Sequence, residues 1–326
     1  MSKPREHWRP SASRELLERR AALLAQTRAF FAERHVLEVD TPILVNAAVT
    51  DVHIESGVVQ LGPRAQRYFL HTSPEYAMKR LLACGSGDIF QICHVVRGGE
   101  RSRLHNPEFT LLEWYRVGFS LEELMNEVEA LARGLLGKAC KGYASERLSY
   151  REAFLRELDL DPFTADLQRL EHIARGIGYR SAHSGAAPRA ELLELLVAAI
   201  VGPRLGRGAL TFLHHYPASQ AALAELDAQQ PGTALRFELY CEGVELANGF
   251  QELTDEREQR RRFQADLAER RQRKLPEIEV DERLLAALAA GLPRCAGVAL
   301  GFDRLLMLAV GARAIEAVLC FPTESA

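Results

Sequence analysis

Residues 235–253, LRFELYCEGVELANGFQEL, contain two runs of β-forming residues on either side of a Glu-Gly pair. A two-residue turn at Glu242 and Gly243 would join the runs as an antiparallel hairpin and set Tyr240 opposite Glu245. Glu238 would then lie on the same sheet face as Glu245, diagonal to it and roughly 7 Å away between backbones. The chain is therefore expected to build its core on an antiparallel sheet.

The paired carboxylates of this hairpin predict a cation site. Like charges so close repel each other unless a cation lies between them, and an oxygen-liking divalent ion such as Mg²⁺ is the natural occupant. Glu252 has the opposite strand parity from Glu245, so a regular strand would send the two to different faces. A β-bulge near residues 247–249 would bring both to one face, and Gly249 is a suitable residue for it.

A second segment, residues 103–116, reads RLHNPEFTLLEWYR and places a carboxylate inside an apolar strand. At period two, one face of this strand carries Phe109, Leu111, Glu113 and Tyr115. A buried carboxylate is costly unless a cation or a hydrogen-bond donor meets it. Either an arginine elsewhere in the chain or a cationic ligand could supply that partner for Glu113, while Trp114 points to the opposite face and is expected to be packing.

The rest of the chain predicts an α+β protein. Helical spacing of apolar residues indicates a long helix over 13–34, followed by the extended segment VLEVDTPIL. Further strands are expected at 67–73, 88–97, 109–118, 209–217 and 297–302, with helices around 255–274, 281–290 and 302–311. Capping boxes open helices at Ser120 with Glu123 and at Ser149 with Glu152. Residues 150–206 are mostly helical and carry no obvious chemistry.

Composition excludes several classes of protein. With 326 residues and 47% hydrophobic content, the chain can bury a large core in one or two domains. It has no signal-peptide pattern and no apolar run of the roughly 18 residues that a membrane span needs, so a cytoplasmic protein without membrane partners is expected. A net charge of −3 gives no global attraction to nucleic acid. The six cysteines lack CxxC spacing, which argues against a structural zinc or a disulfide framework.

Two arginines extend the predicted cation site. Arg97 ends one expected strand, and Arg304 follows GVALGFD at the start of an expected helix. A Mg²⁺ site flanked by two guanidinium groups and an exposed aromatic ring suits a nucleoside triphosphate, because the charges neutralise phosphate and the ring stacks on the base. Each arginine could equally be the structural partner of an acidic residue.

Four blocks of sequence resemble the class II aminoacyl-tRNA synthetases of the lysyl type. VLEVDTPIL is similar to motif 1, HNPEFTLLEWYR after Arg97 to motif 2, GVALGFDR to motif 3, and RFELYCEGVELANGFQEL to the segment before motif 3. The similarity covers residues 13–120 and 208–320. It implies a single catalytic domain over 1–326 on a six-stranded antiparallel sheet flanked by helices, with a helical insertion at about 150–206. It also implies a homodimer formed partly through motif 1.

The resemblance assigns roles by position. Arg97 would hold the α-phosphate and Arg304 the γ-phosphate as the catalytic residues, and Phe109 would stack on adenine. The residues implied in ATP binding are Arg97, Gly98, Gly99, Glu100, His105, Asn106, Phe109, Glu245, Leu246, Gly301 and Arg304. Those implied in amino-acid binding are Ser73, Pro74, Glu75, Glu113, Tyr115, Ala247 and Glu252, and the Mg²⁺ ligands are Glu238 and Glu245. Gly98 and Gly99 depart from the usual motif 2, which has a Glu two residues after its Arg.

In this assignment Glu113, Tyr115 and Glu252 bind the distal ammonium of a lysine-type substrate. Glu113 would be unpaired within the protein because the cationic substrate completes it. Neutral amino acids would leave buried charge uncompensated, which is a physical basis for rejecting them.

Two departures from the synthetases point to a different acceptor. The chain has no anticodon-binding domain before motif 1, so tRNA is not an expected partner, and Ala247 replaces a usual Gly, so its methyl group should alter which lysine isomer fits. Both features are similar to the elongation factor P lysine ligase family, which implies activation of (R)-β-lysine and its transfer to a lysine of elongation factor P. The alternatives are a short lysyl-tRNA synthetase, an amide synthetase with another acceptor, and a non-enzymatic module that kept the fold.

Overall fold

The long helix expected near the N-terminus is present as α1 (Arg14–Ala32), and the Ser13 hydroxyl caps it by accepting a hydrogen bond from the Leu16 N–H. The computed structural model describes residues 8–180 and 188–326. Contacts along the chain divide it into a first unit, Met1–Ala139 with Thr254–Ala326, and a second unit, Cys140–Leu253. The two units are described separately.

The first unit holds most of the predicted strands. In chain order its further elements are β1 (Leu37–Glu38), β2 (Leu44–Val45), β3 (Val58–Leu61), β4 (Gln66–Leu70), α2 (Glu75–Ala83), β5 (Ile89–Val96), β6 (Glu108–Val117), α3 (Leu121–Leu136), α7 (Glu256–Gln272), α8 (Glu282–Gly291), β11 (Cys295–Gly301), α9 (Phe302–Ala309) and the 3₁₀ turn η5 (Ile315–Val318). Strand β6 pairs antiparallel with β5 and with β11, and β1 pairs parallel with β5. A second sheet has the order β2-β4-β3.

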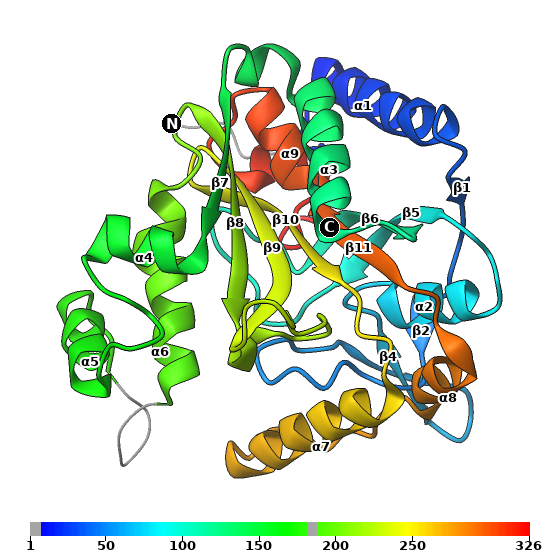
Figure 1. Ribbon diagram of the computed structural model, residues 1–326. Coiled ribbons are helices and arrows are strands. Elements are labelled where there is room, and N and C mark those ends of the chain that lie inside the picture. Colours follow the sequence, from blue (N-terminus) through cyan, green and yellow to red (C-terminus); the bar gives the residue numbers. More distant parts are fainter. Residues whose placement is uncertain (1–7, 181–187) are drawn as a thin grey trace, which may run out of the picture. The chain divides into compact units, whose positions relative to one another are not determined.

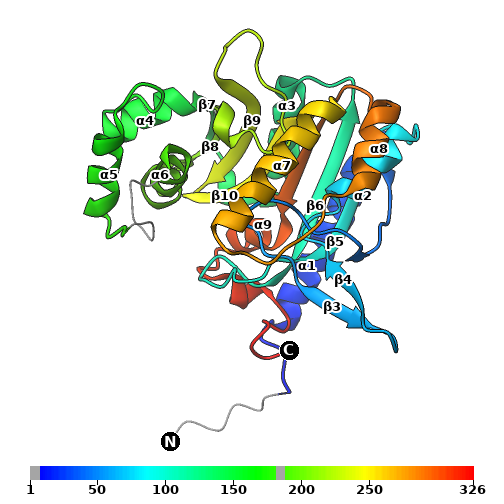
Figure 2. The same ribbon diagram turned by 90° about the horizontal axis from the view of Figure 1, so that it is seen from below.

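Two helical layers accompany these strands. Helices α3 and α9 contact each other and lie against β11 and β6, as Figure 1 shows. Helices α7 and α8 pack together with α2 in the same unit (Figure 2). The expected capping box of Ser120 and Glu123 opens α3, with both reciprocal hydrogen bonds formed.

The second unit contains a four-stranded sheet and a group of helices. The 3₁₀ turn η1 (Gly137–Cys140) stands at the boundary between the units. The elements that follow are β7 (Ala144–Ser149), α4 (Tyr150–Leu158), α5 (Leu167–Gly176), α6 (Arg189–Leu196), the π-helical turn η2 (Val197–Val201), the 3₁₀ turn η3 (Gly202–Arg204), β8 (Ala209–Pro217), the 3₁₀ turn η4 (Ala218–Gln220), β9 (Thr233–Cys241) and β10 (Val244–Gln251). The order β10-β9-β8 is antiparallel, and β8 pairs parallel with β7. The capping box of Ser149 and Glu152 opens α4 as expected.

The α+β class is confirmed, but the six-stranded, wholly antiparallel sheet is wrong in detail. In the described residues the order of the main sheet contains eight strands, four from each unit. The pairs β1–β5 and β7–β8 are parallel. Parallel neighbours need a long crossover connection. Helices α4, α5 and α6 belong to this connection between β7 and β8, and this explains helices without chemistry of their own.

The core of the first unit forms on the Trp114 face of β6. The fully buried ring of Phe31 stacks on Phe90 with 4.4 Å between centroids, and it meets the edge of Trp114 at 5.3 Å. The Trp114 indole N–H donates to a carboxylate oxygen of Glu127 on α3 at 3.1 Å. Trp114 is therefore a packing residue, as its strand parity predicts.

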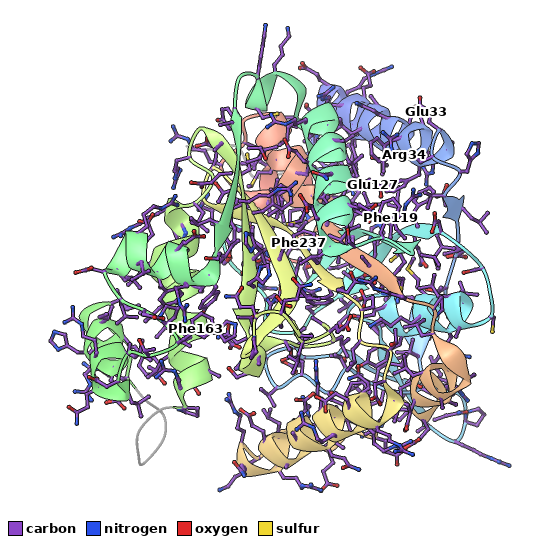
Figure 3. The ribbon with its side chains drawn as sticks, viewed as in Figure 1. Glu33, Arg34, Phe119, Glu127, Phe163 and Phe237 are labelled. Carbon is purple, nitrogen blue, oxygen red and sulfur yellow. The ribbon has the colours of Figure 1, made fainter. Side chains whose placement is uncertain are left out.

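A charged cluster closes this core at the end of α1. The Glu127 carboxylate lies 3.6 Å from the Arg116 guanidinium and 3.8 Å from that of Arg34. Figure 3 labels Glu127 and Arg34. Burial raises the pKa of Glu127, while the charges of Arg116 and Arg34 and the indole hydrogen bond oppose the rise. The cluster thus joins α1, β6 and α3 through one buried carboxylate.

Helices α4, α5 and α6 of the second unit bury an aromatic core of their own. The Tyr150 ring stacks on Phe154 with 4.7 Å between centroids and lies 4.9 Å from Tyr216 on β8. Of these helices α4 packs against β7 and β8, and α5 packs against α6, at the left of Figure 1. None of the helices in the described residues is long and apolar enough to cross a lipid bilayer, and all six cysteines are free thiols.

Replacement of Phe31 by Ala should lower the free energy of unfolding by about 3–5 kcal/mol, because loss of the fully buried ring leaves a cavity between α1 and the strands β5 and β6. Urea denaturation followed by tryptophan fluorescence measures the change. Leu17→Ala is the matched control on the same helix, since Leu17 is 39% exposed, and we expect it to cost under about 1 kcal/mol. Equal losses for the two variants would contradict this description of the core.

Candidate active site

The face of β6 opposite Trp114 carries a buried carboxylate. Glu113 is 2% exposed, and its oxygens accept hydrogen bonds from the Ser73 hydroxyl at 2.7 Å and the Tyr115 hydroxyl at 2.6 Å. Strand parity alone places Glu113 and Tyr115 on one face, and the segment before α2 brings Ser73 to them. Three of the predicted amino-acid-binding residues therefore lie together.

Glu113 has hydrogen-bond partners within the protein, but neither of them is a cation. Its hydrogen-bond partners within the described residues are the two neutral hydroxyls, and no ion pair there involves it. Burial raises the pKa of Glu113 to about 7, the charge of Glu75 adds to the rise, and the bonds from Tyr115 and Ser73 and the charge of Lys79 oppose it. The carboxylate is held in position without a cation of its own, so an ammonium group would favour its ionised form.

Glu75 and Lys79 extend this site along the first turns of α2. The Glu75 backbone N–H donates to the Ser73 hydroxyl at 3.0 Å, and Pro74 stands at the N-cap position between them. The Lys79 ammonium, 1% exposed, donates to the Glu75 carboxylate at 2.6 Å. Sequence reasoning missed Lys79, although a Glu–Lys pair four residues apart on a predicted helix is the signal that could have found it.

Arg97 lies where β5 ends, beside Phe109 at the start of β6. Its Nε donates to the Thr72 carbonyl at 3.2 Å, its guanidinium lies 5.2 Å from the centre of the Phe109 ring, and the Glu100 carboxylate is 3.7 Å from it. Of the predicted ATP-binding residues, Arg97, Glu100 and Phe109 are thus neighbours. The cation–π contact orients the Arg97 guanidinium over the Phe109 ring.

The Gly98-Gly99 departure from motif 2 has a steric cause. The Gly98 N–H donates to the Glu55 carbonyl at 2.7 Å, and a Cβ at Gly98 would lie 2.9 Å from the Glu55 carboxyl carbon. Gly99 has φ +73°, which disfavours other residues. Glu55 therefore occupies the space that a side chain at position 98 would fill, and it is a carboxylate of this region that sequence reasoning missed.

Arg304 and His105 contact each other. The Arg304 guanidinium donates to Nε2 of His105 at 2.6 Å, and its Nε donates to the Leu104 carbonyl at 3.3 Å. Because arginine can only donate, Nε2 is the acceptor and the ring is neutral, with Nδ1 2.7 Å from the Ser102 hydroxyl. Burial lowers the pKa of His105, and the charges of Arg304 and Arg97 lower it further.

Two further predicted ATP residues have mainly local contacts. The Asn106 side chain, 8% exposed, donates to the Glu108 carbonyl at 2.6 Å and accepts from the Thr323 N–H at 3.2 Å. Gly301 stands at the N-cap of α9, where a Cβ would have room. Asn106 thus fixes the loop between β5 and β6 to the C-terminal segment.

The hairpin of the second unit forms as predicted. Glu242 and Gly243 have φ +52° and +73°, which is the two-residue turn, and Glu245 pairs with Tyr240. The register shifts between Glu245 and Ala247, so the predicted bulge is confirmed but its extra residue is Leu246, and the suggestion of Gly249 is wrong. The extra residue reverses the alternation of faces along the rest of the strand. The side chain of Glu252 therefore lies on the same face as that of Glu245.

The same register bears on two further predicted site residues, Ala247 and Leu246. Ala247 pairs with Leu239, whereas Asn248 pairs with Glu238, so Ala247 lies on the face opposite to Glu245 and Glu238. Ala247 and Leu246 are 2% and 1% exposed. This register opposes the expectation that the Ala247 methyl group enters a pocket on the acidic face of β10.

Glu238 does not fit the predicted role of magnesium ligand. One of its oxygens accepts from the Arg236 guanidinium at 2.5 Å and the other from the Tyr240 hydroxyl at 2.6 Å. A divalent cation there would meet the positive charge of the Arg236 guanidinium. Glu245 stays a predicted ligand, and one carboxylate together with the phosphates is a common way to hold Mg²⁺ in nucleotide sites. The described residues contain no cluster of three or more His, Cys, Asp or Glu side chains that would hold a metal alone.

Comparison with known proteins agrees with the motifs. The family model described as tRNA synthetases class II (D, K and N) matches residues 5–325. Proteins named elongation factor P–(R)-β-lysine ligase are 49% identical in Proteus mirabilis and 48% identical in Salmonella typhi, over 323 residues and 98% of each chain. A match of this extent covers both structural units. The chain therefore belongs to the class II tRNA synthetase family of the D, K and N type.

Proposed function

We propose that this chain is an ATP-dependent ligase that activates (R)-β-lysine as an adenylate and transfers it to the ε-amino group of a lysine on elongation factor P. The names and the near-complete coverage of the relatives support the reaction class. The observation that carries the amino-acid specificity is Glu113, a buried carboxylate bonded by two neutral hydroxyls and by no cation of the described chain. A diamino acid brings the missing cation.

The amino-acid end of the site follows from this carboxylate. The distal ammonium of the substrate would donate to Glu113 and Tyr115, with Glu252 as a second acid, and Ser73 and Glu75 would lie nearer its other end. Since one ammonium can satisfy the buried charge, substrates without it would leave Glu113 ionised and uncompensated or protonated. Such a site favours a substrate with a distal ammonium over a neutral amino acid, because only the ammonium pairs with the ionised carboxylate.

In the first step the carboxylate of the bound amino acid attacks the α-phosphorus of ATP, and pyrophosphate leaves. Arg97 would offset the charge that builds at the α-phosphate, and Arg304 the charge at the γ-phosphate. Phe109 would stack on adenine, and His105, neutral and hydrogen-bonded, would hold Arg304 in place. Mg²⁺ held by Glu245 would neutralise triphosphate charge. No general base is needed, because the nucleophile is already a carboxylate.

In the second step the ε-amine of the acceptor lysine attacks the adenylate carbonyl, which gives an amide and releases AMP. The acceptor is thus a protein amine, and tRNA is not a partner in this proposal. We further propose a cytoplasmic homodimer, which fits a modifier of a translation factor.

Incubation with ATP, Mg²⁺, (R)-β-lysine and purified elongation factor P should raise the intact mass of the factor by one lysyl residue. The control is the same factor with its acceptor lysine replaced by Arg, which should keep its mass. Charging of tRNA with α-lysine, with the factor unchanged, would instead identify a short lysyl-tRNA synthetase. Amide formation on another amine would identify an amide synthetase with a different acceptor.

Activation of the amino acid should rise with pH. The pKa of Glu113 is raised to about 7, so below pH 7 the carboxyl is mostly protonated and cannot pair with the ammonium, which stays charged because its own pKa is near 10. In lysine-dependent exchange of pyrophosphate into ATP, kcat/KM should therefore fall about tenfold per pH unit below 7 and level off above it. Glu113→Gln should remove this slope and lower the plateau about a hundredfold. An unchanged slope in this variant would reject the assignment of the titration to Glu113.

Glu252→Gln tests the second acid of the pocket. The KM for the amino acid should rise about tenfold or more, because one charge of the ammonium site is lost, while the KM for ATP should stay within about twofold. Pyrophosphate exchange with each substrate varied in turn separates the two constants. Equal increases in both would count against an amino-acid role for Glu252.

A further inference from the structure

We propose that Glu238 is a positioning residue that connects the helices of the second unit to the acidic strand β10, and that it is not a magnesium ligand. The inference deepens the proposed function, because the strand it supports carries Glu245, but its structural part can be tested without any activity. Every contact that carries it lies within the second unit.

Glu238 has both oxygens engaged by side chains of its own strand. Arg236, two residues before it on the same face of β9, is partly buried and donates from Nη2 to one oxygen at 2.5 Å. Tyr240, two residues after it, is buried and donates to the other oxygen at 2.6 Å. A buried carboxylate with a guanidinium on one side and a phenol on the other is already compensated, and breaking the pair to bind a metal would leave the guanidinium without this partner.

Arg236 passes this constraint to the neighbouring strand. Its Nε lies 3.3 Å from the amide oxygen of Asn248 on β10, and its Nη1 donates to the Gln220 carbonyl at 2.8 Å. The guanidinium also lies 4.3 Å from the centre of the Tyr216 ring. Asn248 follows directly after the bulge between Glu245 and Ala247. The Arg236–Glu238 pair therefore fixes β10 at the point where the bulge sets the direction of Glu245.

Tyr240 passes the constraint in the other direction, to the helices. A Cβ at Gly202, the first residue of η3, would lie 2.9 Å from the edge of the Tyr240 ring, and one at Gly206 would lie 2.6 Å from the Tyr240 carbonyl. Tyr240 also belongs to the apolar core that Tyr150, Leu192 and Leu196 form in the helical segment. The helices thus pack against the Tyr240 ring, the Tyr240 hydroxyl donates to Glu238, and Glu238 pairs with Arg236.

This path gives residues 150–206 a purpose beyond the crossover between two strands. The π-helical turn η2 ends at Val201, and an added Cβ at its C-cap residue Gly202 would meet the Tyr240 ring. Turns of this kind are rare in helices and recur at functional sites. Here the turn would set the position of the Tyr240 ring, which supports β10 through Glu238 and Arg236.

Glu238→Gln and Glu245→Gln separate positioning from metal binding. Glu238→Gln should lower the melting temperature by about 5–10 °C, because it removes the carboxylate that pairs with Arg236, and should leave the MgCl₂ concentration for half-maximal pyrophosphate exchange within about twofold. Glu245→Gln should raise that concentration about tenfold, as loss of a charged ligand does. A tenfold shift in the Mg²⁺ requirement of Glu238→Gln at an unchanged melting temperature would overturn the proposal.

A double-mutant cycle tests the pair without activity. Arg236→Met and Glu238→Leu should each lower the melting temperature, and the double variant with both substitutions should recover part of the loss, because an apolar pair leaves no unpaired charge. Additive losses would reject the Arg236–Glu238 pair. The double variant also remains informative if a single variant does not fold.

Gly202→Ala tests the connection from a distance. The added methyl group must push the Tyr240 ring, so kcat/KM for pyrophosphate exchange should fall about tenfold, since small displacements of positioned groups cost rate. Gly176→Ala is the matched control in the same helical segment, since a Cβ there meets nothing within 4 Å, and it should change kcat/KM less than about twofold. Equal effects of the two variants would reject the path. Absence of exchange in the unmodified protein would reject the proposed function, while the melting-temperature cycle would still decide the role of Glu238.

Discussion

Burial of the Glu113 carboxylate is the interaction on which the site depends. Water is excluded from it, and two hydroxyls supply hydrogen bonds without charge. The protonated and ionised forms are then close in free energy near neutral pH, as the pKa of about 7 expresses. A group poised in this way responds to an arriving cation much more than an exposed carboxylate would, because the cation changes its charge state as well as contacting it.

Strand β6 can hold such a group because its two faces have different tasks. The Trp114 face packs against Phe31 and carries the hydrogen bond to Glu127, while the Glu113 face meets the segment before α2. Neighbouring strands hold β6 on both sides along its length. The carboxylate is therefore placed by a paired, rigid strand, and only Ser73 comes from a loop.

Much of this arrangement is predictable from local patterns. Period two separates Glu113 from Trp114, a Glu-Gly pair fixes the hairpin turn, and Ser-x-x-Glu marks the starts of α3 and α4. The parallel pairs are not predictable in this way, since they depend on partners far along the chain. The bulge shows the limit within one hairpin: parity demands an extra residue, but Leu246 bears no local signal for it. The bond partners of Glu238 were missed because charge alone suggested a metal, and only the face shared with Arg236 and Tyr240 supplies its actual neighbours.

The first unit is discontinuous, with Thr254–Ala326 completing what Met1–Ala139 begins. During synthesis, β6 leaves the ribosome long before β11, whose residues 295–301 pair with residues 111–117. Until then β6 has an open edge and an uncovered apolar surface, a state that favours aggregation. Pairing of strands so distant in sequence also carries a large loop-closure entropy, which slows folding. Building the core from both ends of the polypeptide therefore leaves β6 open to wrong pairing until residues 295–301 have been synthesised.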